Sequence, residues 1–392
     1  MDFSLPEDVK MVQTLVGDFV NDQLRPLERE LLGRAADSSD ARVSLPREVE
    51  DRLVAMVRDI GLWGIGVPEE FGGVGLSTLG NCLVEEELCK TIVPFDLGDV
   101  SPVLFDCTPR QREDYLVPVL DRRRTALIAL MEPGKGADIA DMSTIYRREN
   151  GTYRLNGAKL CFPRLDPAGD CFAVVFAAGM GEGAAAGPSC FLVDSGTPGL
   201  SVGQGGQRVG WRTQLREPVS VVLQDCCVTP DSLLGQEGGA FHLGRKWLPS
   251  RRLVRGARAV GVAGRLLEEA ATQAQSWQSF GQLICGRTSV EAALADIAVG
   301  VHACRLMVYE AASKADEGQP VKREAAMVKL FATQMIRSAA DRVAHVFGGP
   351  PHLAGLPMER MCCHALATSA TDLALELQRH IIAADILKGL TV

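Results

Sequence analysis

The spacing of hydrophobic residues changes twice along this chain, from a helical to a strand pattern and back. This feature constrains the fold more than any other. Residues 1–125 carry apolar side chains mostly at helical spacing, residues 126–240 contain short β-type runs separated by Gly, Pro and Asn turns, and residues 241–392 return to long helical runs. A helical pattern does not suit a strand, and a strand pattern does not suit a helix. The order therefore predicts an α+β protein with an N-terminal helical domain, a middle β domain and a C-terminal helical domain within these limits.

Individual segments sharpen this prediction. Pro46 precedes an amphipathic run and predicts a helix start. The segment "RRENGTYRLNGAKL" predicts two strands joined by a turn at Asn150-Gly151. In the C-terminal part, helical periodicity covers 241–276, 288–316, 321–346 and 358–390. Helices of this length with short connections are typical of an antiparallel four-helix bundle.

Charge and cysteine content exclude several classes of protein. The net charge of -8 argues against a nucleic-acid partner. Twelve cysteines occur without metal-ligand spacing, so we expect no metal site and a reducing, cytoplasmic location. The beginning "MDFSLPEDVKMVQTL" has charges where a signal peptide is apolar, and no apolar run of 18 residues predicts a membrane span.

Six segments carry a resemblance to a known family. They are "GLWGIGVPEEFGGVGLS", "MEPGKGADIADMST", "YRLNGAKLCFPR", "GQRVGWRTQ…VTPDSLLGQEGGAF", "QSFGQLI" and "HVFGGPPHLAGLPMER". In this order and spacing the chain resembles the acyl-CoA dehydrogenases over nearly its whole length. The resemblance implies their fold, with a small middle β-barrel or sheet domain and a C-terminal four-helix bundle. It also implies acyl-CoA as substrate, FAD as cofactor and, in an active enzyme, electron-transfer flavoprotein as partner.

The family's reaction needs a carboxylate base. That base removes the α-proton of the thioester while the flavin takes hydride from the β-carbon. The family's spacing from Glu359, in "PMER", places Asp372 at the base position, where it is one methylene shorter than the usual Glu. Asp372 is therefore either a working base, or a vestigial or ordinary helix-surface carboxylate.

A second base position also departs from the family. Some members place the base on another helix, and the resemblance puts Arg251 at that position, in "LPSRRLVRGAR". Both positions face one pocket in the family, so we expect an Arg251–Asp372 ion pair inside it. Arg251, Arg255 and Arg258 also lie at helical spacing, and the alternative is a solvated or phosphate-facing basic stripe.

The flavin contacts depart from the family pattern repeatedly. Met131 and Ala137 replace hydroxyl-bearing residues, Cys161 and Pro163 replace Trp and Thr, and Trp277 replaces an Arg that reaches the neighbouring subunit's FAD. Each lost bond to a charged group costs roughly 1.5–3 kcal/mol, so the set predicts a weak or absent FAD site. The full set of positions that the resemblance assigns to cofactor binding is Met131, Gly136, Ala137, Asp138, Cys161, Pro163, Trp277, Phe280, His345, Gly348 and Gly349.

These departures favour a divergent subunit for α,β-dehydrogenation of an acyl-CoA, acting in a heteromeric complex with an intact flavin-bearing paralogue. One alternative is a self-sufficient homo-oligomeric FAD enzyme that uses Asp372 as base. Another is a non-redox binding protein on the same fold. The segments "FGQLI" and "VFGGPP" resemble the family's subunit contacts, so we expect a homo- or hetero-oligomer built through the C-terminal bundle.

Overall fold

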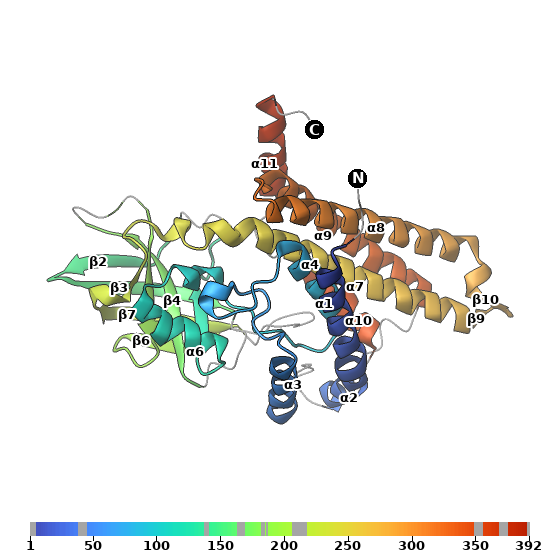
Figure 1. The fold of residues 1–392 in the computed structure, drawn as a ribbon, viewed down its shortest axis with the longest axis horizontal. Helices are drawn as coiled ribbons and strands as arrows, with labels where there is room; N and C mark the ends of the chain where they lie inside the picture. The colour runs from blue at the N-terminus through green and yellow to red at the C-terminus, as the bar shows by residue number, and fades with distance from the viewer. Residues whose placement is uncertain are drawn as a thin grey trace.

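A computed structural model describes residues 5–37, 45–136, 141–162, 169–181, 185, 187–205, 218–348, 356–367 and 375–389. Along the chain it has helices, then a β sheet, then long helices, which confirms the predicted α+β fold class. The β domain lies at one end of the molecule, and the long helices extend from it to the other end (Figure 1). The domain limits at 125/126 and 240/241 stay a prediction.

The N-terminal part consists of short helices. They are α1 (Glu7–Phe19), α2 (Glu28–Asp37), α3 (Arg47–Asp59), α4 (Thr78–Leu88), α5 (Pro109–Gln111) and α6 (Val117–Leu120). As predicted, α3 begins directly after Pro46. The most deeply packed of these is α4, whose Cys82 and Leu83 are fully buried and which contacts both α7 and α8. Consequently α4 is the main element through which the N-terminal part meets the C-terminal helices.

The middle part is built on one main sheet. Its strands are β1 (Thr125–Ala129), β2 (Ile145–Glu149), β3 (Thr152–Cys161), β4 (Cys171–Gly179), β5 (Ser189–Asp194), β6 (Leu200–Gln204), β7 (Val219–Val228) and β8 (Leu233–Leu234). Their order is β6-β7-β3-β2-β4-β5-β8, with β1 pairing to β4. β2 and β3 pair in antiparallel register around Asn150 and Gly151, which both have positive φ. The predicted turn is therefore confirmed, and this backbone suits a type I′ hairpin.

The C-terminal part contains α7 (Leu248–Ser276), α8 (Thr288–Asp316), α9 (Lys322–Phe347), α10 (Pro357–Ala367) and α11 (Leu375–Leu387). A small hairpin of β9 (Gln278–Ser279) and β10 (Gln282–Leu283) joins α7 to α8. The first predicted helix was placed too early, because short 3-10 turns occupy Ala240–His242 and Arg245–Trp247 before α7 begins. The fourth prediction, a single helix over 358–390, is wrong. This part of the chain contains two helices, α10 and α11, which lie well apart in Figure 1.

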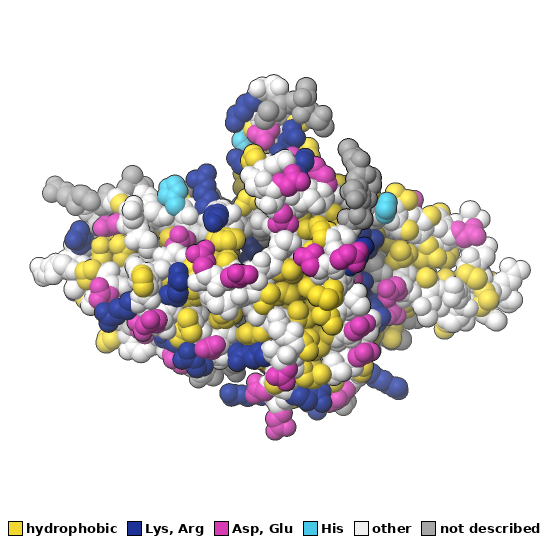
Figure 2. Space-filling view, in the orientation of Figure 1, with side chains coloured by type: hydrophobic (Ala, Val, Ile, Leu, Met, Phe, Trp, Pro, Cys, Tyr) yellow, Lys and Arg dark blue, Asp and Glu magenta, His cyan; other side chains and the backbone are white. Residues whose placement is uncertain are grey.

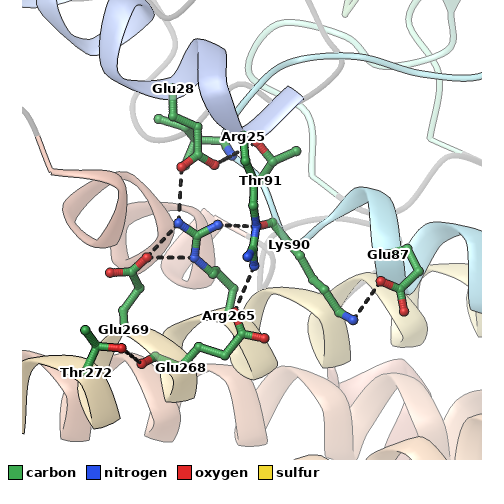
Figure 3. A network of polar contacts seen from close by, with 10 residues as sticks. Arg25, Glu28, Glu87, Lys90, Thr91, Arg265, Glu268, Glu269 and Thr272 are labelled. Carbon is green, nitrogen blue, oxygen red and sulfur yellow. Dashed lines mark hydrogen bonds and ion pairs between the residues drawn. The ribbon is translucent and has the colours of Figure 1, made fainter. Parts of the chain in front are cut away.

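One apolar core joins the N-terminal helices to α7, α8, α9 and α10, and a second fills the sheet interior. A buried polar network strengthens the first junction (Figure 3). Arg265 on α7 donates to Glu28 (3.2 Å), to Glu269 (2.7 Å) and to the carbonyl of Lys90 (2.9 Å). Thr91 also donates to Glu28, at 2.7 Å. This network fixes the start of α2 and the end of α4 against the middle of α7.

Among the described helices, α8 alone is long and apolar enough by composition to cross a membrane. Only 22% of its most apolar stretch is buried in this chain. However, Arg305 on α8 donates to the buried Glu86 of α4 at 2.8 Å, and Tyr309 donates to the same carboxylate at 3.1 Å. A charged side chain held in this way at mid-helix is expensive in a bilayer, so it favours α8 as a helix of the bundle.

Candidate active site

A cavity of about 280 Å³ lies where α4, the start of α7, the Gly-rich loop 65–76 and the segment 97–105 meet. Much of its wall is apolar, including Ile65, Leu76, Val84, Phe105 and Trp247. Polar side chains interrupt that wall, and they are Glu69, Thr78, Asn81, Glu85, Asp99, Ser250 and Arg251. A mostly apolar pocket with a few convergent polar groups is the usual form of a small-molecule site.

Close backbone packing shapes the loop side of this cavity. A Cβ at Gly73 would stand 2.0 Å from the carbonyl oxygen of Val67, and a Cβ at Gly66 would stand 2.8 Å from Asn81 Oδ1. Side chains at these positions would collide with the loop itself or with α4. The glycines of "GVPEEFGGVGLS" thus allow the loop to fold tightly over the N-terminal end of α4.

Arg251 stands at the cavity wall in an ion pair. Its Nη1 lies 2.5 Å from Asp99 Oδ1, and its Nη2 donates to the carbonyl of Val100 at 3.0 Å. A guanidinium stays protonated in proteins, so Arg251 cannot act as a base. Its described carboxylate partner is Asp99. Asp372 lies outside the described residues, so the Arg251–Asp372 pair stays a prediction.

The stripe of arginines on α7 is not uniformly solvated. Arg258 makes two hydrogen bonds to Glu85, at 2.7 Å from Nε and 3.1 Å from Nη2, while Arg255 is exposed. Burial alone would lower the pKa of Arg258, but the charge of Glu85 outweighs it and the pKa is raised. Arg258 is therefore paired across the α4–α7 junction, and Arg251 is paired with the segment 97–105, so neither is a solvated cation of a uniform basic stripe.

The N-terminal end of α4, which lines the cavity, is held by a distant carboxylate. Asp316, the last residue of α8, accepts hydrogen bonds from the backbone N–H groups of Thr78 (2.6 Å) and Leu79 (2.9 Å). Ser77, the residue before α4, accepts another from Gly80 at 3.1 Å. These bonds satisfy N–H groups that a helix leaves without partners in its first turn.

The predicted cofactor-binding residues of the β domain are not all on its surface. Met131 is 40% exposed, and its carbonyl accepts a hydrogen bond from the backbone N–H of Leu160. Gly136 is exposed, whereas Cys161 is fully buried in the sheet interior, and burial raises its pKa to about 12. The assignment of the Cys161 position to a cofactor site stays a prediction. The adjacent Phe162 carries an exposed aromatic side chain, as the two-residue alternation of a strand predicts.

A buried ion pair anchors the loop that contains Met131. Lys159 donates to Glu132 at 2.8 Å, and Glu132 also accepts from the backbone N–H groups of Ser143 (2.7 Å) and Thr144 (2.8 Å). Burial alone would raise the pKa of Glu132, but these hydrogen bonds together lower it from 4.5 to about 2. This carboxylate is thus a fixed structural anion.

The β9–β10 hairpin lies at the opposite end of the molecule from the β domain (Figure 1). Trp277 and Phe280 belong to the hairpin that follows α7, and Phe280 is 95% exposed. His345 is exposed near the end of α9, and Gly348 follows that helix with φ of 71°. The 29 residues of α7 span roughly 43 Å, so one chain does not bring Trp277 and Phe280 to Met131.

Ala137, Asp138, Pro163 and Gly349 lie outside the described residues. At the described positions of the β domain, the side chains do not fit tight binding of a flavin dinucleotide. The Lys135 ammonium lies 2.7 Å from Asp141, Cys161 is buried, and the exposed Met131 and Phe162 are apolar. A flavin pyrophosphate needs charge-assisted donors, and the cation of the described loop 131–136, Lys135, is already paired with Asp141.

Comparison with known proteins gives the same family for all three parts of the chain. The models "Acyl-CoA dehydrogenase, N-terminal domain", "middle domain" and "C-terminal domain" match residues 6–123, 128–220 and 241–387. The chain is 31% identical to (R)-benzylsuccinyl-CoA dehydrogenase of Thauera aromatica, over 89% of this chain and 88% of the relative. It is 30% identical to cyclohexane-1-carbonyl-CoA dehydrogenase of Geobacter metallireducens, over 98% and 99%. The structure of butyryl-CoA dehydrogenase from Megasphaera elsdenii matches with a TM-score of 0.83 and 27% identity, over 99% of this chain and 100% of that one.

Proposed function

Because this chain belongs to the acyl-CoA dehydrogenase family, we propose that it binds an acyl-CoA as a divergent subunit of a heteromeric dehydrogenase. The acyl group would occupy the cavity between α4 and α7. One observation carries this proposal: Arg251, at a position where the family resemblance expects a base beside the substrate, lines that cavity. The same observation argues that the subunit does not use this helix for proton abstraction.

The size of the cavity supports an acyl group as its occupant. An engineered cavity of about 150 Å³ accommodates benzene, and this one has a volume of about 280 Å³. Its apolar walls, including Leu88, Leu97 and Val254, suit methylene groups. The relatives act on acyl groups as different as benzylsuccinyl and cyclohexane-1-carbonyl, so the names alone do not choose one.

The separation of the predicted cofactor residues supports a cofactor site shared between neighbouring subunits. Those in the β domain and those of the hairpin, Trp277 and Phe280, lie at opposite ends of the chain, so one chain cannot close a site around both groups (Figure 1). The β-domain group also lacks charge-assisted donors at its described positions. In the proposed complex, the paralogue holds the flavin, which accepts hydride from the substrate. This chain contributes acyl-CoA binding and subunit contacts.

Exposed apolar side chains on the C-terminal helices support assembly. The α8 apolar face, which we define as Ala292, Ala295, Val299 and Leu306, follows helical spacing and is exposed. Val299 is 70% exposed, and hydrophobic side chains gather over this end of the bundle in Figure 2. Exposed patches of this kind mark protein–protein contacts. We propose that the α8 apolar face and the hairpin meet a paralogous subunit.

The experiment purifies this chain alone and co-expressed with flavin-bearing paralogues from the source cells. The proposal expects acyl-CoA binding by calorimetry and recovery of a stable complex, which transfers electrons from acyl-CoA to electron-transfer flavoprotein or a dye. A yellow chain that turns over alone would establish the homo-oligomeric enzyme that uses Asp372. If the chain binds no acyl-CoA, either alone or in the complex, the remaining hypothesis is a non-redox binding protein.

A further inference from the structure

Charged side chains on the polar wall of the cavity between α4 and α7 form ion pairs. Two carboxylates of this wall are matched by guanidinium groups, Asp99 by Arg251 and Glu85 by Arg258. The exposed fractions of these four side chains lie between 13% and 29%, so water screens the pairs only partly. The wall is therefore polar without an uncompensated positive charge that would attract an anion.

Asn81 adds an acceptor to this wall. Its side-chain amide donates to the carbonyl oxygens of Leu76 (2.8 Å) and Ser77 (3.1 Å). Because two carbonyl oxygens lie on one side of the Asn81 amide, the NH₂ group must be on that side. The amide oxygen, Oδ1, is therefore on the opposite side. Oδ1 points to Gly66, where an added Cβ would lie 2.8 Å away, and both residues line the cavity.

Two hydroxyl groups complete the wall. Thr78 on α4 and Ser250 on α7 both line the cavity, with their oxygens 3.5 Å apart. This distance is at the long limit of a hydrogen bond, so the pair binds weakly to itself. A ligand hydroxyl in this cavity has an acceptor in Asn81 Oδ1 and donors in the hydroxyls of Thr78 and Ser250.

We infer that this cavity selects an acyl group that carries a neutral hydroxyl, in preference to an unsubstituted alkyl chain or a carboxylated one. The inference rests on the proposed function, because it assigns the cavity to the acyl group. An alkyl chain would remove water from these polar atoms without replacing its hydrogen bonds. A carboxylate would meet Glu69, Glu85 and Asp99, while the charge of Arg251 is already matched by Asp99. A hydroxyl group avoids both costs.

The test is isothermal titration calorimetry of the full chain, or of its complex with the paralogue, against matched six-carbon ligands. These are hexanoyl-CoA, the 4-, 5- and 6-hydroxyhexanoyl-CoA isomers and adipyl-CoA, with free CoA as baseline. We expect one hydroxylated isomer to bind about tenfold more tightly than both hexanoyl-CoA and adipyl-CoA. A preference below threefold for every isomer, or tightest binding of adipyl-CoA, overturns the inference. If no acyl-CoA binds more tightly than CoA, the proposed function itself fails.

A double variant, Thr78→Val with Ser250→Ala, assigns the preference to the wall. We expect the preference to fall to within threefold while the affinity for hexanoyl-CoA stays equal or rises. The matched control is Thr272→Val with Ser276→Ala, which removes hydroxyls bonded to carbonyls of the same helix outside the cavity. The assignment to Thr78 and Ser250 is overturned if the first double variant keeps its preference for the hydroxylated ligand. It is also overturned if the control double variant loses that preference to the same extent. The titration of the unmodified chain remains decisive where a variant does not fold.

Discussion

At the scale of single residues, the Glu132–Lys159 pair is the most consequential buried contact of the β domain. Both side chains are at most 6% exposed. We expect Glu132→Gln to lower the free energy of unfolding by about 3 kcal/mol, because it leaves Lys159 buried without a counter-charge. Urea denaturation measures this. The control Glu149→Gln removes a half-exposed pair with Arg154 and should cost under about 1 kcal/mol. Equal effects of the two variants would contradict the prediction.

The same carboxylate makes a prediction for acid stability. Its pKa is lowered on folding, from 4.5 to about 2, so the folded state favours the ionised form. The contribution of Glu132 is therefore complete above about pH 4.5 and is lost as the pH falls towards 2. Thermal unfolding between pH 6 and pH 3 should show a smaller loss of stability in Glu132→Gln than in the unmodified chain. Parallel curves for the two proteins would exclude this role.

Asp372 lies outside the described residues but carries a sharp prediction. Its side chain is one methylene shorter than the family's usual base, and the proposed complex places dehydrogenation on the paralogue. We therefore expect Asp372→Asn to leave the activity of the complex within threefold, measured with an acyl-CoA series and a dye acceptor. A loss of about 1,000-fold, the scale of a lost general base, would support the self-sufficient enzyme. In that case Asp372→Glu should restore or raise turnover.

At the scale of elements, the cavity depends on how α4 begins. Asp316 reaches the first N–H groups of α4 from the end of α8, so one carboxylate joins two helices. We expect Asp316→Ala to destabilise the protein by about 1 kcal/mol, the usual cost of a lost N-terminal cap, in urea denaturation. The neighbouring Glu317→Ala is the control, since among the contacts described its side chain accepts a hydrogen bond only from the exposed Gln319. If the two variants have the same free energy of unfolding, the Asp316 cap does not contribute measurably to stability.

The α8 apolar face makes a prediction about assembly. Replacing both Val299 and Leu306 by Glu puts two charges on a surface that we propose meets another subunit, and burying them there is costly. We expect light scattering of the chain, or of its complex, to show loss of the assembled species. Val222→Glu places an acidic residue on an exposed part of β7 and serves as control. An unchanged mass in the double variant would locate the interface elsewhere.

At the scale of the whole molecule, the question is whether the chain binds flavin by itself. The described residues of the predicted site in the β domain are apolar or buried, and the nearby Lys135 is already paired with Asp141. We therefore expect titration of the isolated chain with FAD to show no saturation at micromolar concentrations. A flavin-bearing paralogue treated identically is the control. Flavin that copurifies at one per chain would refute the degenerate site.

Much of the fold was predictable because the signals for it are local. Helical and strand periods report which face of each element is buried, and Asn150-Gly151 marks a turn through its backbone preferences alone. Helix ends were less accurate, as the late start of α7 shows, because capping and tertiary packing decide the last turns. The placement of Cys161 depended on strand register, in which an error of one residue exchanges the buried and exposed faces.

The sequence by itself determined the family, the order of the three parts and the loss of hydroxyl and guanidinium groups at positions of the flavin motif. These are properties of residue type and spacing, which folding does not change. Only the tertiary structure decided which charges meet. Arg251 pairs with Asp99, 152 residues away, and Arg258 pairs with Glu85, 173 residues away. Such contacts depend on how α4 and the segment 97–105 pack against α7, and no local sequence pattern predicts contacts between residues so far apart in the chain.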